Sequence, residues 1–266
     1  MAEDKRKVVE HTNLNLMLLG RPHSGKSSLI NSMFKEFCDG DQTIALTGRT
    51  VAEGTAFYEK KKVFRVDGSP ITCETSHNKF AVKQLSIFDT CGCRFSSKLT
   101  QDQILFIRSL LNGCKAGIEL LQCNIAEKLY QYVVPDNKID VVTIVISASE
   151  LVREMEIPAT WGFQWLYPSE RKPVIVPEAV AFIVNLSNMI RRIEKYHPLV
   201  VVTGLDTIPP DMKSKVITEI DDRIHEDNYF IMTTWQPRKR VMCDESKKAI
   251  RQYLTRLLHI HHSVTQ

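Results

Sequence analysis

The feature that most constrains this chain is a glycine-rich loop between a predicted strand and a predicted helix. Residues 20–27 read Gly-Arg-Pro-His-Ser-Gly-Lys-Ser and match the pattern G-x-x-x-x-G-K-[ST] in full. The compact apolar run Leu14–Leu19 precedes the loop and predicts a buried strand. Over Ser27–Phe37 the apolar residues recur at helical spacing. A chance glycine-rich turn before a helix is the alternative, and the flanking strand and helix favour a phosphate-binding loop.

The residue types of this loop suit the binding of a nucleotide's phosphates. Gly20 and Gly25 let the backbone wrap around phosphate oxygens, while successive N–H groups and the positive end of the helix attract the anion. Lys26, also a candidate catalytic residue, is expected to reach the β- and γ-phosphates, and the Ser27 hydroxyl to ligate magnesium. Ser28 is expected to add a contact near the α-phosphate. The predicted phosphate contacts are therefore Gly20, His23, Ser24, Gly25, Lys26, Ser27 and Ser28.

A second motif puts a carboxylate at the end of another apolar strand. The run Leu85–Phe88 leads into Asp89-Thr90-Cys91-Gly92, which has the form D-x-x-G. Magnesium needs a carboxylate on the far side of the phosphates, so Asp89 is expected to hold the ion through water and the Gly92 N–H to sense the γ-phosphate. Aspartate and glycine are also common turn residues. The position of this motif downstream of a complete phosphate loop favours the metal site.

A third motif bears on which base is bound. The strand-like run Val200–Val202 continues into Thr203-Gly204-Leu205-Asp206, a T-x-x-D pattern where GTPases present [NT]-K-x-D. An aspartate there accepts two N–H groups that guanine has and adenine lacks. Gly204 replaces the lysine that would stack on the base, so Thr203 and Asp206 predict a weakened guanine preference. The alternative for Asp206 is a helix cap before Pro209.

Two further segments complete the predicted site. Thr234 and Trp235 follow the strand-like run Tyr229–Met232, where GTPases close over the base. Trp235 either stacks on the base or packs in the core. Between the loop and Asp89, Thr50 is the first choice for a switch threonine whose hydroxyl completes the magnesium shell. Thr50 is equally well explained as an exposed strand residue.

The order of predicted elements indicates an α/β fold. Val141–Ile146 and Leu199–Val202 are short β-branched runs typical of central parallel strands covered on both faces. Helical patterns over Pro177–Tyr196, Asp211–Glu226 and Glu245–His259 supply the crossovers that parallel neighbours need. We therefore expect a doubly wound, mostly parallel sheet with helices on both faces. The sequence further predicts strands at Phe57–Val66 and Val82–Phe88 and a helix over Asp102–Leu111 that ends at Asn112-Gly113.

The domain organisation follows from the same pattern. Residues 1–13 are polar and predict a tail, and residues 14–266 are expected to form a single P-loop domain similar to a G-domain. Insertions are expected at about 93–139 and 154–176, the second being rich in proline and aromatic residues. Within it, Trp161–Tyr167 holds four aromatic side chains. They either form an exposed partner-binding patch or fold back on the core.

Composition excludes several other classes of protein. The chain of 266 residues is 43% hydrophobic and 25% charged, which argues against disorder and fibrous repeats. The net charge of +4 argues neither for nor against nucleic acid, no DNA partner is expected, and no apolar run approaches the roughly 20 residues of a membrane span. Seven cysteines, an odd number, suit a reducing cytoplasm better than a disulfide framework. His259, His261 and His262 are explained either by a frayed helix end or by transition-metal binding.

These motifs, taken in order, resemble those of the translation-factor-related P-loop GTPases. More narrowly, the chain resembles the interferon-inducible GTPase-like family that includes the hepatitis-C-associated microtubular aggregate protein, over about Leu14–Leu258. The resemblance rests on Met17–Gly20, Ser24–Ser28, Asn31-Ser32, Ala45–Gly48, Asp89–Gly92, Leu110–Gly113 and Ile146–Ser149. It implies a P-loop fold with guanine nucleotide as ligand and Mg²⁺ as cofactor.

Departures from that family limit what the resemblance implies. Family members often carry an extra domain before the loop, whereas 13 residues precede Leu14 here. Cys93 follows D-x-x-G where well-studied small GTPases have a glutamine that orients water, so hydrolysis is expected to be slow. His23 occupies a position where some large GTPases place a charged catalytic residue, so it is the leading substitute. The alternative is a solvent-facing loop histidine.

The function that these motifs favour is GTP binding with slow, magnesium-dependent hydrolysis, in a nucleotide switch or assembly factor that acts through a protein partner or a homodimer. The expected cofactors are GTP or GDP and Mg²⁺, with Lys26, His23 and Thr50 as catalytic candidates. Thr50 and the Gly92 loop are expected to respond to nucleotide. An ATP-dependent phosphotransferase is a second class. A nucleotide-binding scaffold with little or no turnover is a third, favoured by Cys93 and Gly204.

Overall fold

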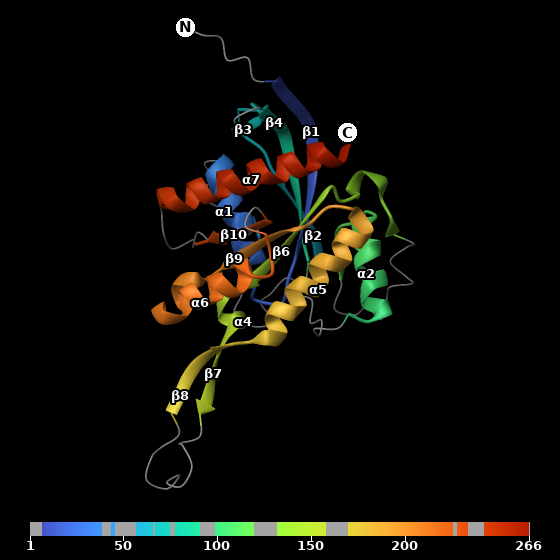
Figure 1. Cartoon of the computed structure of the whole chain (residues 1–266). Helices are drawn as coiled ribbons and strands as arrows, with labels where there is room; N and C mark the ends of the chain where they lie inside the picture. The colour runs from blue at the N-terminus through green and yellow to red at the C-terminus, as the bar shows by residue number, and fades with distance from the viewer. Residues whose placement is uncertain are drawn as a thin grey trace, which may run out of the picture.

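The described part of the chain forms one mixed sheet flanked by helices, with a two-stranded arm that projects from one end (Figure 1). The computed structural model describes residues 7–38, 44–45, 57–65, 67–74, 78–90, 99–119, 132–157, 170–225, 228–233 and 242–265. Within these residues the main sheet has eight strands, and seven of them follow the order β10-β9-β6-β1-β4-β2-β5. The eighth strand, β3, pairs with β4.

The parallel part of the sheet is built around β1. Its neighbours are β6 and β4, and β9 and β10 continue the sheet beyond β6. The remaining strands β2, β3 and β5 run antiparallel to their partners. The strand bounds are β1 Lys7–Leu19, β2 Phe57–Val63, β3 Ile71–Glu74, β4 Asn78–Asp89, β5 Ile118–Glu119, β6 Val141–Ser147, β9 Leu199–Thr203 and β10 Tyr229–Met232. The carboxyl ends of the parallel strands meet at one edge, where the glycine-rich loop follows β1.

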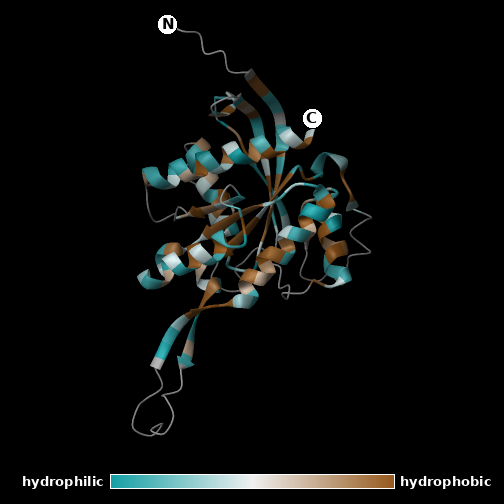
Figure 2. Cartoon of the chain, in the orientation of Figure 1, coloured by the Kyte–Doolittle hydropathy of each residue, from teal (hydrophilic) through white to brown (hydrophobic). Residues whose placement is uncertain are grey.

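Helices cover both faces of this sheet, so the predicted doubly wound α/β fold is confirmed. Because successive side chains of a strand point to opposite faces, β1 contributes to two separate cores. Met17 and Leu19 belong to one apolar cluster with α2 (Gln101–Leu111), α5 (Pro177–Glu194) and α6 (Pro210–Asp221). Leu16 and Leu18 belong to the other, with α1 (Lys26–Cys38) and α7 (Asp244–Thr265). Figure 2 shows apolar strands in the middle of the molecule and polar outer faces on the helices.

Most predicted elements lie within a few residues of their expected bounds. The helix α2 ends at Leu111, where Asn112 caps it and Gly113 adopts a φ of 96°, a conformation that favours glycine. The strand β3 was not predicted, because its four residues simply alternate between buried and exposed, a pattern too short to identify from sequence alone. No helix in the described part of the chain is both long and apolar enough to cross a membrane.

Two strands outside the main sheet, β7 (Val152–Ile157) and β8 (Glu170–Ile175), form an antiparallel arm. In Figure 1 this arm extends away from the body of the molecule at the lower end. At its base the Val176 N–H donates to the Leu151 carbonyl at 2.8 Å, which holds the two ends of the arm together. The arm occupies part of the insertion predicted at 154–176, and the aromatic stretch Trp161–Tyr167 lies outside the described residues.

The first strand begins seven residues before the predicted one, inside the segment expected to be a tail. Residues 7–13 pair in parallel with β4, in a register that sets Lys7 opposite Asn78 and Asn13 opposite Gln84. Five of the seven side chains in this stretch are polar or charged, and only Val8 and Val9 are apolar, so the local pattern does not predict a strand. The strand is therefore set by pairing with a distant segment, which a local apolar pattern does not report.

A cluster of histidines joins this extension of β1 to the last turns of α7. The ring centroids of His11 and His261 are 4.7 Å apart, and those of His11 and His262 are 6.2 Å apart. The ring centroids of His259 and His262 lie 6.4 and 6.0 Å from the ring centroid of Phe80. The histidines near the C-terminus therefore lie within α7 and not at a frayed end. Across the described ranges, no three His, Cys, Asp or Glu side chains are arranged to hold a metal ion.

The cluster is an unfavourable place for a proton. Burial lowers the pKa of His11, and the neighbouring His261 and His262 lower it further. Burial also lowers the pKa of His261, although the nearby Asp140 carboxylate acts in the opposite direction. The Nε2 atom of His11 is buried and has no hydrogen-bond partner. Packing between β1 and α7 therefore favours neutral imidazoles.

We expect the free energy of unfolding to fall as the pH drops below about 6.5. There the unfolded chain binds protons that folded His11 and His261 resist, so acid favours unfolding, whereas above this pH both states are neutral at these positions. Urea unfolding at about pH 5.5 and 7.5 measures the effect. His11→Phe keeps an aromatic ring and is expected to weaken the pH dependence. His225→Phe, at an exposed histidine of the same chain, should keep it. An equal pH dependence in His11→Phe and the parent contradicts this assignment.

Candidate functional site

The glycine-rich loop packs tightly against the ends of two strands. A Cβ atom on Gly20 would lie 2.1 Å from the carbonyl oxygen of Val145 in β6, so no side chain fits there. A Cβ on Gly25 would lie 2.8 Å from the Thr203 Oγ1 of β9, and Gly25 has a φ of 93°. His23 is exposed and also has a positive φ, of 62°. A positive φ costs free energy at a non-glycine residue such as His23, and it is tolerated where the surroundings fix the backbone.

Thr203 supports this loop from behind. Its buried hydroxyl donates to the Ser24 carbonyl at 2.7 Å, across a sequence separation of 179 residues. A longer contact of 3.4 Å joins the same hydroxyl to the Ile146 carbonyl. The structure therefore places Thr203, predicted as a nucleotide contact, where it fixes the loop backbone against β6 and β9.

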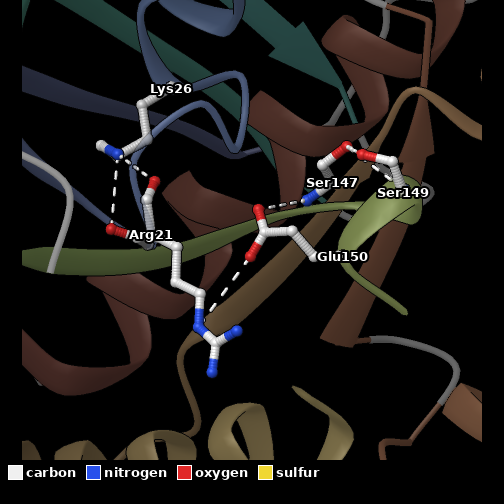
Figure 3. Close-up of polar contacts among 6 residues, drawn as sticks. Arg21, Lys26, Ser147, Ser149 and Glu150 are labelled. Atoms are coloured by element: carbon white, nitrogen blue, oxygen red, sulfur yellow. Dashed lines mark hydrogen bonds and ion pairs between the residues drawn. The ribbon is translucent and has the colours of Figure 1, made fainter. Parts of the chain in front are cut away.

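Lys26 starts α1 and folds back over the loop (Figure 3). Its ammonium group donates to the Arg21 carbonyl at 2.9 Å and to the Gly20 carbonyl at 3.4 Å. The side chain is buried, with 5% of the residue exposed. A positive charge is thus held inside the turn of a loop whose backbone N–H groups begin a helix, an arrangement that attracts anions.

Ser27 and Asp89 meet beside the loop from different elements. The Ser27 hydroxyl, at the start of α1, donates to the Asp89 Oδ2 at the end of β4 over 2.8 Å. Asp89 is fully buried. The neighbouring Thr90 hydroxyl donates to the Leu18 carbonyl at 2.7 Å and ties the end of β4 to β1. A hydroxyl and a carboxylate are hard oxygen ligands, so this pair fits a small divalent cation such as Mg²⁺.

Asp206 lies at the exposed end of β9. It belongs to a single 3-10 turn, η3 (Leu205–Thr207), that follows Gly204, whose φ is 68°. The Thr207 hydroxyl donates to the Gly204 carbonyl at 2.6 Å and closes this turn. The next helix, α6, has Pro209 at its N-cap and no side-chain cap. The interpretation of Asp206 as a cap of that helix is therefore wrong, and its carboxylate is left exposed to solvent.

Part of the predicted site lies outside the described residues. This holds for Thr50, for Gly92 and the following Cys93, and for Thr234 and Trp235. Ser28 is described and lies in the first turn of α1, where its carbonyl accepts the Ser32 hydroxyl at 2.8 Å. The described part of the site therefore brings together the loop, Lys26, Ser27 and Asp89.

Asn31 of α1 anchors the chain upstream of Thr50. Its side-chain oxygen accepts the N–H groups of Ile44 and Ala45 at 3.0 and 2.9 Å, and its Nδ2 donates to the Ala45 carbonyl at 3.0 Å. Asn31 is fully buried. This short segment is thereby held next to the helix that follows the loop.

Two charged residues of the site were not predicted from the sequence. Arg21, in the loop, points its Nε toward the Glu150 Oε2 at 4.0 Å (Figure 3), and its guanidinium lies 5.2 Å from the ring centroid of Phe182. Glu150 belongs to the short helix α4 (Ala148–Leu151), where it completes a capping box with Ser147. The S-x-x-E spacing of residues 147–150 signals a helix start and was the available clue to its position.

Burial raises the pKa of Glu150. The Ser147 N–H and the charges of Arg21, Lys26 and His23 act in the opposite direction and favour the carboxylate. Arg21, Lys26 and His23 all belong to the glycine-rich loop. Glu150 therefore shares its stabilising charges with whatever anion binds in that loop.

Comparisons with solved structures give matches at low sequence identity. No family model matches the chain, and no curated protein matches it. Era in complex with MgGDPNP and 16S ribosomal RNA nucleotides 1506–1542 is 16% identical over 86% of this chain and 51% of the Era chain, with a TM-score of 0.36. A septin GTPase domain from Chlamydomonas reinhardtii is 13% identical over 90% and 78% of the two chains, with a TM-score of 0.40.

A probable GTP-binding protein engB is 14% identical over 93% of this chain and 98% of engB, with a TM-score of 0.39. The chain thus spans about half the length of the Era chain. Because these TM-scores do not exceed 0.40, the fold assignment rests on the strand order and pairing of this chain.

Replacing Thr203 by valine is expected to lower the free energy of unfolding by about 1–3 kcal/mol. Valine keeps the shape but removes the hydroxyl that donates to the buried Ser24 carbonyl. The matched control is Thr207→Val, which removes a similar bond from an exposed threonine and should cost less. Urea unfolding of the two variants measures the difference. Equal losses would show that the loop gains nothing from the Thr203 bond.

Proposed function

We propose that this chain binds a guanine nucleotide with Mg²⁺ at the loop of residues 20–27 and hydrolyses GTP slowly, as a nucleotide switch or assembly factor. The observation that carries the proposal is the contact of Ser27 with Asp89 beside a phosphate-type loop. It joins the first turn of α1 to the end of β4, two elements that the sequence keeps 62 residues apart. A chance glycine-rich turn has no reason to bring these two groups together.

Phosphate binding is supported by the charge and shape of the loop. Lys26 is held by the carbonyls of Gly20 and Arg21, inside the turn that precedes α1. The left-handed conformation of Gly25 directs the chain into the helix, whose first N–H groups attract an anion. We assign the phosphate contacts to this loop, with Ser28 next to them.

Ser27 and Asp89 are the residues that would hold magnesium, with Thr50 as a further proposed ligand. The ion, when bound, would neutralise negative charge on the phosphates during their transfer. This chain's own part is to hold the hydroxyl and the carboxylate in place, which the bond from Thr90 to Leu18 supports by fixing the end of β4. The buried position of Asp89 excludes water from one side of the pair.

Guanine is the proposed base because of the turn after β9. Asp206 presents an exposed carboxylate there, and Thr203 of the same turn region contacts the phosphate loop. One short segment therefore joins the proposed base site to the proposed phosphate site. Thr234 and Trp235 are proposed to close over the base.

Slow turnover is proposed because Cys93 follows D-x-x-G in place of a water-orienting glutamine. His23, exposed in the loop with a φ of 62°, is the proposed substitute. Gly92 and Thr50 are proposed to sense the γ-phosphate, and the switch is proposed to act through a protein partner or a second copy of the chain. The chain is further proposed to work in the cytoplasm.

Loss of the loop ammonium is expected to weaken nucleotide binding by at least about 100-fold, or about 2.7 kcal/mol. Lys26→Ala removes the buried charge, and isothermal titration calorimetry with GTP or GDP and Mg²⁺ measures the affinity. Lys248→Ala, on the exposed face of α7, is the matched control and should bind as the parent does. Equal affinities for Lys26→Ala and the parent would remove the loop from the proposal.

The base assignment has its own test. Asp206→Ala is expected to lower the affinity for GTP by about 10-fold or more and to leave that for ATP unchanged, because only guanine offers two N–H groups to this carboxylate. Calorimetry with both nucleotides gives the ratio, and Asp211→Ala in α6 is the control for the loss of an exposed charge. If the parent binds ATP as tightly as GTP, the guanine assignment fails while nucleotide binding stands.

A further inference from the structure

One side chain of the glycine-rich loop, Arg21, contacts both helices that flank the β7–β8 arm in the chain. Arg21 faces Glu150 at 4.0 Å and lies over the Phe182 ring at 5.2 Å. Glu150 is in α4, whose last residue directly precedes β7. Phe182 is in α5, which begins two residues after β8 ends. The loop thus contacts the element before the arm and the element after it.

The base of the arm is a single packed unit. The Val176 N–H donates to the Leu151 carbonyl at 2.8 Å, so the two strands leave the body from one point. Val152, Ile175 and Val176 pack against the apolar cluster that contains Phe182. Farther out, residues 153–156 are exposed. A movement of α4 against α5 would therefore be passed to the whole arm.

On its other side, Arg21 is joined to the phosphate-binding lysine. The Lys26 ammonium donates to the Arg21 carbonyl at 2.9 Å, so an anion that binds Lys26 acts on the peptide that carries the Arg21 side chain. Figure 3 shows this sequence of contacts, from Lys26 through Arg21 to Glu150. The contacts run from the centre of the loop to α4 and end in the 4.0 Å ion pair between Arg21 and Glu150.

From this geometry we propose that Arg21 is a positioning residue that couples occupancy of the phosphate site to the β7–β8 arm. The inference rests on the proposed nucleotide binding. Nucleotide phosphates and the Glu150 carboxylate are both anions, and they compete for the Arg21 guanidinium, whose Nε lies 4.0 Å from the Glu150 Oε2. Bound phosphate weakens the hold of Arg21 on Glu150, and the base of the arm loosens.

Coupling of this kind is reciprocal. If nucleotide changes the equilibrium of the arm, a partner that holds the arm changes the affinity for nucleotide by the same factor. The partner need not approach the loop, because α4 and α5 carry the effect. This gives the arm a role that a purely structural hairpin would not have.

Hydrogen exchange of the full chain, read by mass spectrometry, tests the coupling. Exchange is measured without nucleotide, with GDP and Mg²⁺, and with a non-hydrolysable GTP analogue and Mg²⁺. We expect peptides covering 151–157 and 170–176 to exchange about threefold to tenfold faster when nucleotide is bound. Peptides covering α7 serve as the internal control and should not change.

Variants separate coupling from simple packing. Glu150→Gln removes the competing charge, and Phe182→Leu removes the ring under the guanidinium; both should abolish the response of the arm to nucleotide. Phe182→Tyr keeps the ring and should restore the response. Glu154→Gln, which removes an exposed carboxylate of the arm itself, should respond as the parent does. Every variant is compared at a nucleotide concentration that calorimetry shows to be saturating.

The outcomes distinguish the two proposals. Saturable binding with unchanged exchange at the arm overturns the coupling and leaves the proposed function intact. A response that persists in Glu150→Gln and Phe182→Leu also overturns it, because the effect then travels by another route. If the parent binds no nucleotide, both proposals fail together.

Discussion

The loop between β1 and α1 depends on two backbone approaches that leave no room for a side chain. A Cβ on Gly20 would meet the Val145 carbonyl, and one on Gly25 would meet the Thr203 side chain. The hydroxyl of Thr203 then fastens the loop through the Ser24 carbonyl. The shape of the loop is thus set by packing against β6 and β9. A loop fixed by such contacts loses little conformational freedom when an anion binds, so more of the attraction appears as affinity.

The parallel sheet turns distant positions of the sequence into one site. The strands β1, β4, β6 and β9 end at the same edge, and each delivers a group to it. β4 supplies Asp89, β6 leads into Glu150, and β9 supplies Thr203. A ligand at this edge contacts elements on both sides of β1, as expected where connections leave a doubly wound sheet in opposite directions.

The sequence allowed the site to be predicted where chemistry and local pattern coincide. The loop, the buried strand β6 and the end of α2 at Gly113 each have a physical signal within a few residues. The beginning of β1 and all of β3 have none, because pairing with β4 determines them. The same limit applies to Arg21. Its partner Glu150 is 129 positions away in the chain, and an arginine in a loop predicts a phosphate contact as readily as an ion pair.

The arm shows how modest contacts limit what the proposed nucleotide site can control. A two-stranded ribbon is at best marginally stable alone, so β7 and β8 depend on their packed base. The Arg21 and Glu150 side chains are 32% and 18% exposed, so their ion pair contributes about 0–1 kcal/mol, and the contact with Phe182 about 0.5–2 kcal/mol.

Reversing a two-state equilibrium from 1:99 to 99:1 takes about 5.5 kcal/mol of differential binding, more than these contacts supply. Nucleotide alone would therefore bias the arm by degrees instead of switching it completely. A full change of state would need further free energy from a partner that holds the arm. Since the proposed coupling would be reciprocal, that partner would also change the affinity of the loop for the proposed nucleotide.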